Sequence, residues 1–162
     1  MILSLSIGAC DREIDRISTE NLKADKIIIK KSERKLSLLM GSHVLKTYKV
    51  ALGSNPIGPK MKEGDGKTPE GLYIIDRHNL NSSFHLSLHI SYPPASDRER
   101  ALRSGARPGG DIMIHGIKNG LGWIGSLHRL ADWTQGCIAV TNKEIEEISA
   151  SVPDGTPIEI QP

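Results

Sequence analysis

The sequence predicts a mostly β fold, a sandwich-like arrangement of mixed or antiparallel sheets with one or two short helices. Three observations predict it. Strand-like segments separated by short polar turns follow one another over residues 26–50. Residues 84–92 alternate strictly between apolar and polar side chains, which is typical of a half-buried strand. Helical patterns are confined to two short segments, residues 97–105 and 141–152.

The first half of the chain reads as a meander followed by a long loop. A charged turn and a Gly-Ser turn separate three expected antiparallel strands, at residues 26–30, 35–40 and 43–50. Residues 53–71 are rich in glycine and proline, so we expect an irregular loop there, before a strand over residues 72–76. Part of this loop resembles a phosphate-binding motif, but methionine stands at position 61, where that motif needs glycine.

The second half combines strands with the two helices. On the strand over residues 84–92, His85 and His89 stand about 13 Å apart at ~3.3 Å per residue, too far to share a metal ion. We therefore predict no metal site, and expect that one of these histidines lines the substrate groove. The second helix should begin at Thr141, which has capping-box spacing to Glu144. The last expected strand covers residues 157–160.

Length and charge limit the organisation and the partners. The 162 residues predict one folded domain, which we place at residues 26–162. The chain has 21 basic and 19 acidic residues, scattered along it, and therefore a formal net charge of +2. It contains one Phe, two Trp and three Tyr, so it offers few surfaces on which bases could stack. These features argue against nucleic acid as a partner.

The N-terminal segment resembles the end of a lipoprotein export signal. Residues 1–10 are apolar or small and end at Cys10, and charged residues begin at Asp11. We therefore expect residues 1–25 to be a signal-like segment and tether, with Cys10 as a lipidation site and membrane anchor, and the protein to lie in the periplasm or cell envelope. A start assigned too far downstream is one alternative, because a basic region is missing. A disulfide between Cys10 and Cys137 is another.

A histidine and a cysteine carry the strongest chemical signal. The apolar strand over residues 112–114 ends at His115, and 22 positions later a glycine-framed turn presents Cys137. A thiol becomes a strong nucleophile when a neighbouring imidazole takes its proton, so this pair predicts a nucleophile and its base. Gly136 lets the backbone approach a substrate carbonyl, and the amides around it can stabilise an oxyanion.

These motifs resemble those of a known family. Ile-His-Gly at residues 114–116 and Thr-Gln-Gly-Cys at residues 134–137 resemble the active-site signature of YkuD-type L,D-transpeptidases, which remodel peptidoglycan. The resemblance continues through residues 48–53, 68–75 and 152–160. It implies a YkuD-like β fold and, as partners, peptidoglycan stem peptides.

The resemblance also implies roles for individual residues. Cys137 would form a thioester with a stem peptide, by analogy at the bond between diaminopimelate and terminal D-Ala, and this chemistry needs no cofactor. His115 would be the proton donor and acceptor, and the Gly136 amide would bind the oxyanion. No Asp or Asn that would orient His115 is evident in the sequence, so we expect a backbone carbonyl, that of Gly116, to orient it. Our candidates for substrate binding are four further residues: Thr134, Gln135, His89 and Trp123.

The chain departs from the family pattern at two positions and in one loop. Ala139 and Gln135 stand where many members have arginine and some have histidine, and the segment between His115 and Cys137 is longer than is typical. These departures indicate a subgroup with its own substrate preference, and they leave a carboxylate-anchoring role without its arginine.

Three functions remain open from the sequence. The first is a transpeptidase that forms a crosslink or attaches a wall-linked protein. The second is a hydrolase on the same scaffold, either an L,D-carboxypeptidase or an amidase that releases a wall-linked protein. The third is a non-catalytic wall-binding module, against which the Cys-His pair argues. A papain-like peptidase is disfavoured because its cysteine precedes its histidine in the sequence.

Overall fold

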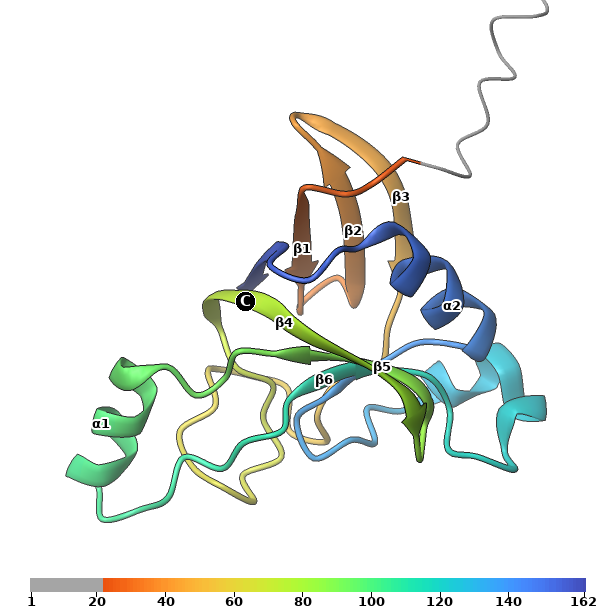
Figure 1. Ribbon diagram of the computed structural model, residues 1–162. Coiled ribbons are helices and arrows are strands. Elements are labelled where there is room, and N and C mark those ends of the chain that lie inside the picture. Colours follow the sequence, from red (N-terminus) through yellow and green to blue (C-terminus); the bar gives the residue numbers. More distant parts are fainter. Residues whose placement is uncertain (1–21) are drawn as a thin grey trace, which may run out of the picture.

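The computed structural model describes residues 22–162, and the export-signal and lipidation predictions at Cys10 lie outside the described residues. The described chain forms one mixed sheet of eight strands in the order β3-β2-β1-β8-β4-β5-β6-β7 (Figure 1). Short helices accompany it. The prediction of a mostly β fold with mixed strand directions is confirmed.

The first half of the sheet is the predicted meander joined by the C-terminal strand. The meander consists of β1 (Lys26–Lys30), β2 (Lys35–Met40) and β3 (His43–Lys49), paired antiparallel in sequence order. β8 (Pro157–Gln161) runs parallel to β1 and antiparallel to β4. Alternate residues of β1 and β2 are buried, as their apolar and polar alternation requires.

One long strand connects the two halves of the sheet. β4 (Gly71–Ser82) extends well beyond the predicted residues 72–76. Its first residues, 71–74, pair with β8, whereas residues from Ile75 onward pair with β5 (His85–Ile90). β4 therefore belongs to both halves, and the expected sandwich is formed by one continuous sheet.

The second half of the sheet continues through three strands. β5 pairs antiparallel with β6 (Met113–His115), and β6 runs parallel to β7 (Ile138–Ala139). In β5 both Ser87 and Leu88 are buried, so the polar residues of this strand do not simply face solvent as its alternation predicts. The reason is its internal position, since β4 and β6 flank it and α2 packs against it.

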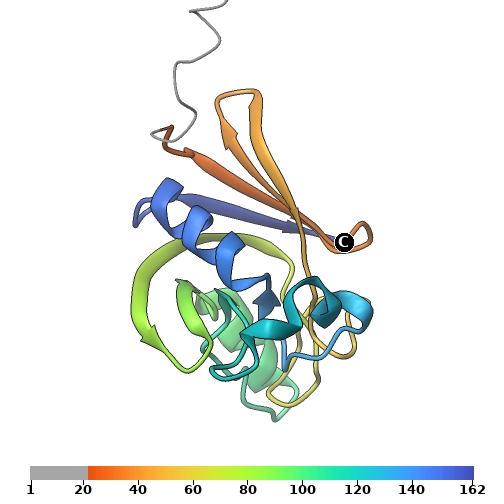
Figure 2. The ribbon, with the colours of Figure 1, turned by 90° about the vertical axis from the view of Figure 1, so that its right-hand side faces the viewer.

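Two α-helices lie outside the sheet. α1 (Ala95–Arg103) and α2 (Asn142–Ser151) occupy the two predicted segments, and α2 begins with the predicted capping box. In Figure 2 the blue helix α2 lies between the orange strands of the β1–β3 meander and the green strands β4 and β5. Its buried residues Ile145 and Ile148 join the core. It thereby closes the space between the halves of the sheet.

The segment predicted to be an extended loop contains helical turns. The 3-10 segment η3 (Gly122–Leu130) is interrupted at Gly125, which has a φ of 54°.

Within residues 22–162, no helix combines the length and the apolar character that crossing a membrane requires.

Candidate functional site

Two adjacent parallel strands bring His115 and Cys137 together. Ile114 in β6 lies opposite Ile138 in β7. Side chains alternate along a strand, so His115, one residue after Ile114, and Cys137, one residue before Ile138, point to the same side of the sheet. Both line one cavity of about 500 Å³. The sequence separates these residues widely, and the parallel pairing of β6 with β7 removes that separation.

His115 is fixed as a neutral base. Its ring is buried, and Nδ1 donates a hydrogen bond to the carbonyl oxygen of Gly116 at 2.7 Å. A carbonyl oxygen can only accept, so Nδ1 carries the proton and Nε2 keeps its lone pair. Phe84 and Trp133 pack on the ring at centroid distances of 4.5 and 5.8 Å. Burial lowers the pKa of His115 and outweighs the opposite effect of the Gly116 carbonyl.

Cys137 is protonated at rest for a related reason. Its Sγ lies 3.5 Å from the carbonyl oxygen of Asp111 and donates a weak hydrogen bond to it. Burial raises the pKa of this thiol, and the Asp111 carboxylate adds to that effect, whereas the amide of Met113 and the charge of Lys60 oppose it. The resting pair is therefore a neutral thiol beside a neutral imidazole, and the thiolate must form when the imidazole takes the proton.

The turn that presents Cys137 is held from inside. The Thr134 hydroxyl accepts a hydrogen bond from the Gly136 amide at 3.1 Å and donates one to the Cys137 carbonyl oxygen at 2.7 Å. Gly136 has a φ of 131°, and a Cβ atom there would lie only 2.6 Å from the Lys67 carbonyl oxygen. Position 136 therefore has room only for glycine.

The amides of the turn differ in their availability to an oxyanion. The Gly136 amide already has an acceptor in Thr134, so its predicted oxyanion role stays a prediction. Among residues 22–162, the Cys137 amide donates no hydrogen bond outside the strand ladders. It is therefore the donor in the turn that could meet an oxyanion without first losing a partner.

The cavity walls come from four parts of the chain. They are the end of β4 with the β4–β5 turn, the segment before β6, β6 itself and the Cys137 turn, with these lining residues: Asn79, Ser82, Ser83, Phe84, Asp111, Met113, His115, Trp133, Thr134, Gln135 and Cys137. Asp111 is the only carboxylate among them, and none is lysine or arginine. Ala139, two residues after Cys137, is fully buried.

The structure brings some predicted substrate-binding residues to the cavity and leaves others outside. Thr134 and Gln135 line it, the former with its hydroxyl engaged in the turn and the latter exposed. His89 does not line it, because its ring lies between Asp76, at 2.6 Å, and Asp111, at 3.8 Å. Trp123 is 79% exposed on η3 and is absent from the cavity wall.

Sequence reasoning missed several cavity residues. Trp133 lines the cavity and packs on His115, a role that its position near the Cys137 turn in the sequence does not reveal. Ser82, Ser83 and Phe84 reach the site only through the pairing of β4, β5 and β6, for which the sequence carries no local signal. Asp111 directly follows two glycines, which indicate a turn, and it has a φ of 52°. This glycine pair is the one sequence signal that pointed to the segment before β6.

Comparison with known proteins finds a matching family model and a similar curated protein. The family model of the YkuD L,D-transpeptidase catalytic domain matches residues 24–160. YafK of Escherichia coli (strain K12) is 34% identical over 128 residues, which are 75% of this chain and 44% of that protein. The chain therefore spans less than half the length of this curated relative.

Solved structures share the fold. Bd1075 of Bdellovibrio bacteriovorus superimposes with a TM-score of 0.57 at 25% identity, over 88% of this chain and 49% of that one. Pgp2 of Campylobacter jejuni, described as a helical cell shape determining protein, gives a TM-score of 0.63 at 23% identity, over 87% of this chain and 51% of that one. In both cases about half of the longer protein corresponds to this chain.

Proposed function

Because the chain belongs to the YkuD family of L,D-transpeptidase catalytic domains, we propose that it transfers acyl groups of peptidoglycan stem peptides through a thioester on Cys137. The observation that carries this proposal is the placement of His115 and Cys137 on one face of adjacent strands, in one cavity. A wall-binding module would need neither the thiol nor a histidine whose tautomer is fixed by Gly116.

The first half-reaction forms the thioester. Nε2 of His115 takes the thiol proton, and the Cys137 sulfur attacks the carbonyl carbon of the donor peptide bond, which makes a tetrahedral intermediate with a negative oxygen. The Cys137 amide donates to that oxygen, and the Gly136 amide can join if Thr134 releases it. His115 then returns its proton to the leaving amine as the carbon–nitrogen bond breaks.

The second half-reaction releases the acyl group. An acceptor amine loses a proton to Nε2 of His115 as it attacks the thioester carbonyl, and the Cys137 sulfur leaves and recovers that proton. The Nδ1 proton stays on the ring, hydrogen-bonded to the Gly116 carbonyl oxygen throughout, so Nε2 alone handles every proton transfer. Phe84 and Trp133 cover the ring and limit the access of water to it.

One feature of the cavity favours a second candidate, hydrolysis. A terminal D-amino acid carries a carboxylate, and the lining residues include no lysine or arginine to bind it. The position that holds arginine in many family members is the buried Ala139. An amidase that releases a wall-linked protein needs no cation for a leaving carboxylate, and water then replaces the acceptor amine.

A product assay distinguishes the candidates. The purified chain is incubated with defined tetrapeptide muropeptides, with and without an acceptor stem, and with a muropeptide joined to a lysine-containing peptide. Mass spectrometry then scores crosslinked, shortened and released products. Crosslinked products support the transpeptidase, shortened stems the carboxypeptidase and released peptide the amidase. The proposal would be contradicted if the wild type converted no more substrate than the Cys137→Ala variant does.

The substrate also determines where the protein would work. Peptidoglycan lies outside the cytoplasmic membrane, so the proposal places the protein in the periplasm or cell envelope. A fractionation experiment with an antibody against the chain would test that location. Recovery in the cytoplasmic fraction alone would contradict it.

A further inference from the structure

The glycine-rich loop over residues 53–70 packs directly behind the Cys137 turn. A Cβ atom at Gly53 would lie 2.2 Å from the Gly66 carbonyl oxygen and 3.1 Å from the Gly136 Cα. A Cβ atom at Gly136 would lie 2.6 Å from the Lys67 carbonyl oxygen. Because backbone meets backbone at these points, no side chain can adjust, and the position of the turn depends on the position of the loop.

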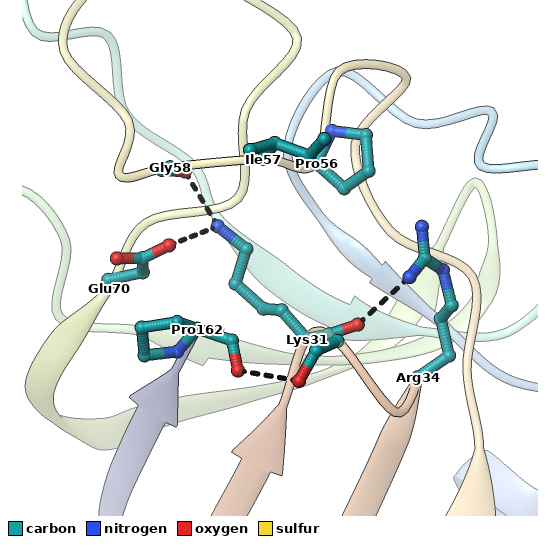
Figure 3. A pocket seen from close by; sticks show the side chains of 8 residues that line it. Lys31, Arg34, Pro56, Ile57, Gly58, Glu70 and Pro162 are labelled. Carbon is teal, nitrogen blue, oxygen red and sulfur yellow. Dashed lines mark hydrogen bonds and ion pairs between the residues drawn. The ribbon is translucent and has the colours of Figure 1, made fainter.

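A buried lysine joins the middle of this loop to its end. The Lys31 ammonium donates to the Gly58 carbonyl oxygen at 2.7 Å, to the Thr68 carbonyl oxygen at 2.9 Å and to Glu70 Oε1 at 2.8 Å. Figure 3 shows the Gly58 and Glu70 contacts in a pocket of about 210 Å³. All the protons of Lys31 have acceptors, so we assign this residue a structural role.

A second buried lysine organises the interior of the loop. Lys60 and Asp65 form an ion pair at 2.8 Å, with side chains only 3% and 8% exposed. The Asp65 carboxylate also accepts backbone amides from Met61, Lys62 and Lys67 at 2.8, 3.1 and 3.0 Å. Burial alone would raise the pKa of Asp65, but Lys60 and these amides outweigh it and lower the pKa to about 2.

Lys60 also reaches the segment that contacts the thiol. A Cβ atom at Gly109 would lie 3.6 Å from Lys60 Cε. Two residues later, the Asp111 carbonyl oxygen accepts the hydrogen bond from Cys137 Sγ. Lys60 therefore packs against Gly109, away from solvent. Solvent screens a buried charge weakly, so Lys60 acts over a longer range than a surface lysine, and Asp65 offsets part of its field.

We propose that Lys60 is a positioning residue for the thiol chemistry: its ion pair with Asp65 holds the loop against the Cys137 turn, and its ammonium stabilises the Cys137 thiolate. This inference rests on the proposed function only in giving Cys137 the role of nucleophile. No bond to Lys60 forms or breaks in the reaction. Its action is electrostatic and geometric.

Two charged groups from different segments act on Cys137: Lys60 in the loop and Asp111 before β6. His115 lines the same cavity as Cys137, Asp65 pairs with Lys60, and His89 lies 3.8 Å from Asp111. Lys60 lowers the thiol pKa and Asp111 raises it. Removing the charge of Lys60 should therefore make the thiol less reactive near neutral pH, and removing the charge of Asp111 should make it more reactive. A general loosening of the structure would not produce these opposite effects.

The test is the pH profile of Cys137 alkylation in the full chain. Iodoacetamide reacts with the thiolate, and peptide mapping follows the Cys137 peptide separately from Cys10. We expect Lys60→Met to raise the apparent pKa of Cys137 by about half a unit to one unit, and so to slow alkylation near neutral pH by about three- to tenfold. Asp111→Asn should lower the apparent pKa, and asparagine tolerates the positive φ of that position.

A double variant separates the charge of Lys60 from its contribution to folding. Lys60→Met alone leaves the Asp65 carboxylate with its backbone amides but without a counter-ion. Lys60→Met with Asp65→Asn leaves no unpaired buried charge, so it should recover part of any lost thermal stability while the apparent thiol pKa stays raised. It also provides the readout if the single variant does not fold.

Two results would overturn the inference. One is an unchanged apparent pKa of Cys137 in a folded Lys60→Met or double variant. The other is a shift in the same direction for Lys60→Met and Asp111→Asn. The alkylation readout does not involve peptidoglycan, so a chain that shows the expected shifts but converts no muropeptide would retain the role of Lys60 and lose the proposed function.

Discussion

Nδ1 of His115 donates a hydrogen bond to the Gly116 carbonyl oxygen, and this bond fixes which nitrogen of the ring is free to act as a base. In many catalytic triads a carboxylate orients the histidine and stabilises its cationic form. Here the orienting group is a neutral backbone carbonyl of the next residue. It fixes the tautomer, but it gives the imidazolium less stabilisation than a carboxylate would, which agrees with the lowered pKa of His115.

The role of His115 can be tested by replacing it. We expect His115→Gln to slow acylation of Cys137 by about 10²- to 10⁴-fold, the usual contribution of a general base. The measurement is the acylation rate with a carbapenem, followed by mass spectrometry. His43→Gln, at an exposed position on β3, is the matched control and should leave the rate unchanged. An unchanged rate in His115→Gln would transfer the role to another group, with the buried His128 the first to examine.

The lowered pKa of His115 has a consequence for the pH profile of acylation. The base is active only when deprotonated, so activity falls as pH drops through the pKa of His115. Because burial moves that pKa below its usual 6.5, we expect the midpoint of the acid limb to lie below pH 6.5. Phe84→Ala exposes the ring that Phe84 covers at 4.5 Å and should move the midpoint toward higher pH. A wild-type midpoint above 6.5 would contradict the assignment.

Thr134 should matter through its hydroxyl rather than through substrate contact. Thr134→Val keeps the shape but removes the oxygen that links the Gly136 amide to the Cys137 carbonyl. We expect about 1–3 kcal/mol lower stability, because two buried groups lose their partner, and an acylation rate reduced about ten- to a hundredfold. Denaturant unfolding and acylation kinetics measure the two effects. Thr134→Ser should restore both, and a failure to do so would remove the hydroxyl from the account.

Gly136 should tolerate no side chain. In Gly136→Ala the new Cβ would meet the Lys67 carbonyl oxygen at 2.6 Å, at a positive φ, so the turn must move or the loop behind it must open. We expect a loss of more than about 1 kcal/mol in stability and at least a hundredfold loss in acylation rate. Gly41→Ala also has a positive φ but has no atoms within 4 Å of the new Cβ. Equal effects of the two substitutions would show that backbone strain alone, and not this contact, is responsible.

The parts of the fold that were predictable depend on local patterns. Apolar alternation located β1, β2 and β3, and the capping box located the start of α2, because neighbours in the chain determine these features. The length of β4 was not predictable, since it depends on two partners, β8 and β5, at different points of the chain. The helical turns of η3 likewise lack a periodic signal that would distinguish them from a loop.

The candidate site divides in the same way. His115 and Cys137 could be found because each closes a motif that is legible in the sequence. His89 lies outside the cavity lining and contacts Asp76, which sits at a register shift between β4 and β5. A bulge of this kind depends on pairing rather than on sequence alone. Trp123 resembled a substrate-covering aromatic, but its side chain lies on η3, away from the cavity.

The most direct test of the account is the mass of the acyl-enzyme. The full chain is incubated with a carbapenem, and intact mass spectrometry with peptide mapping locates any adduct. We predict one adduct per chain, on the peptide that contains Cys137, retained in Cys10→Ser and absent from Cys137→Ala, which should stay folded because a half-buried thiol in a turn contributes little packing. An adduct on folded Cys137→Ala, or on another residue of the wild type, would contradict the assignment of Cys137 as the nucleophile.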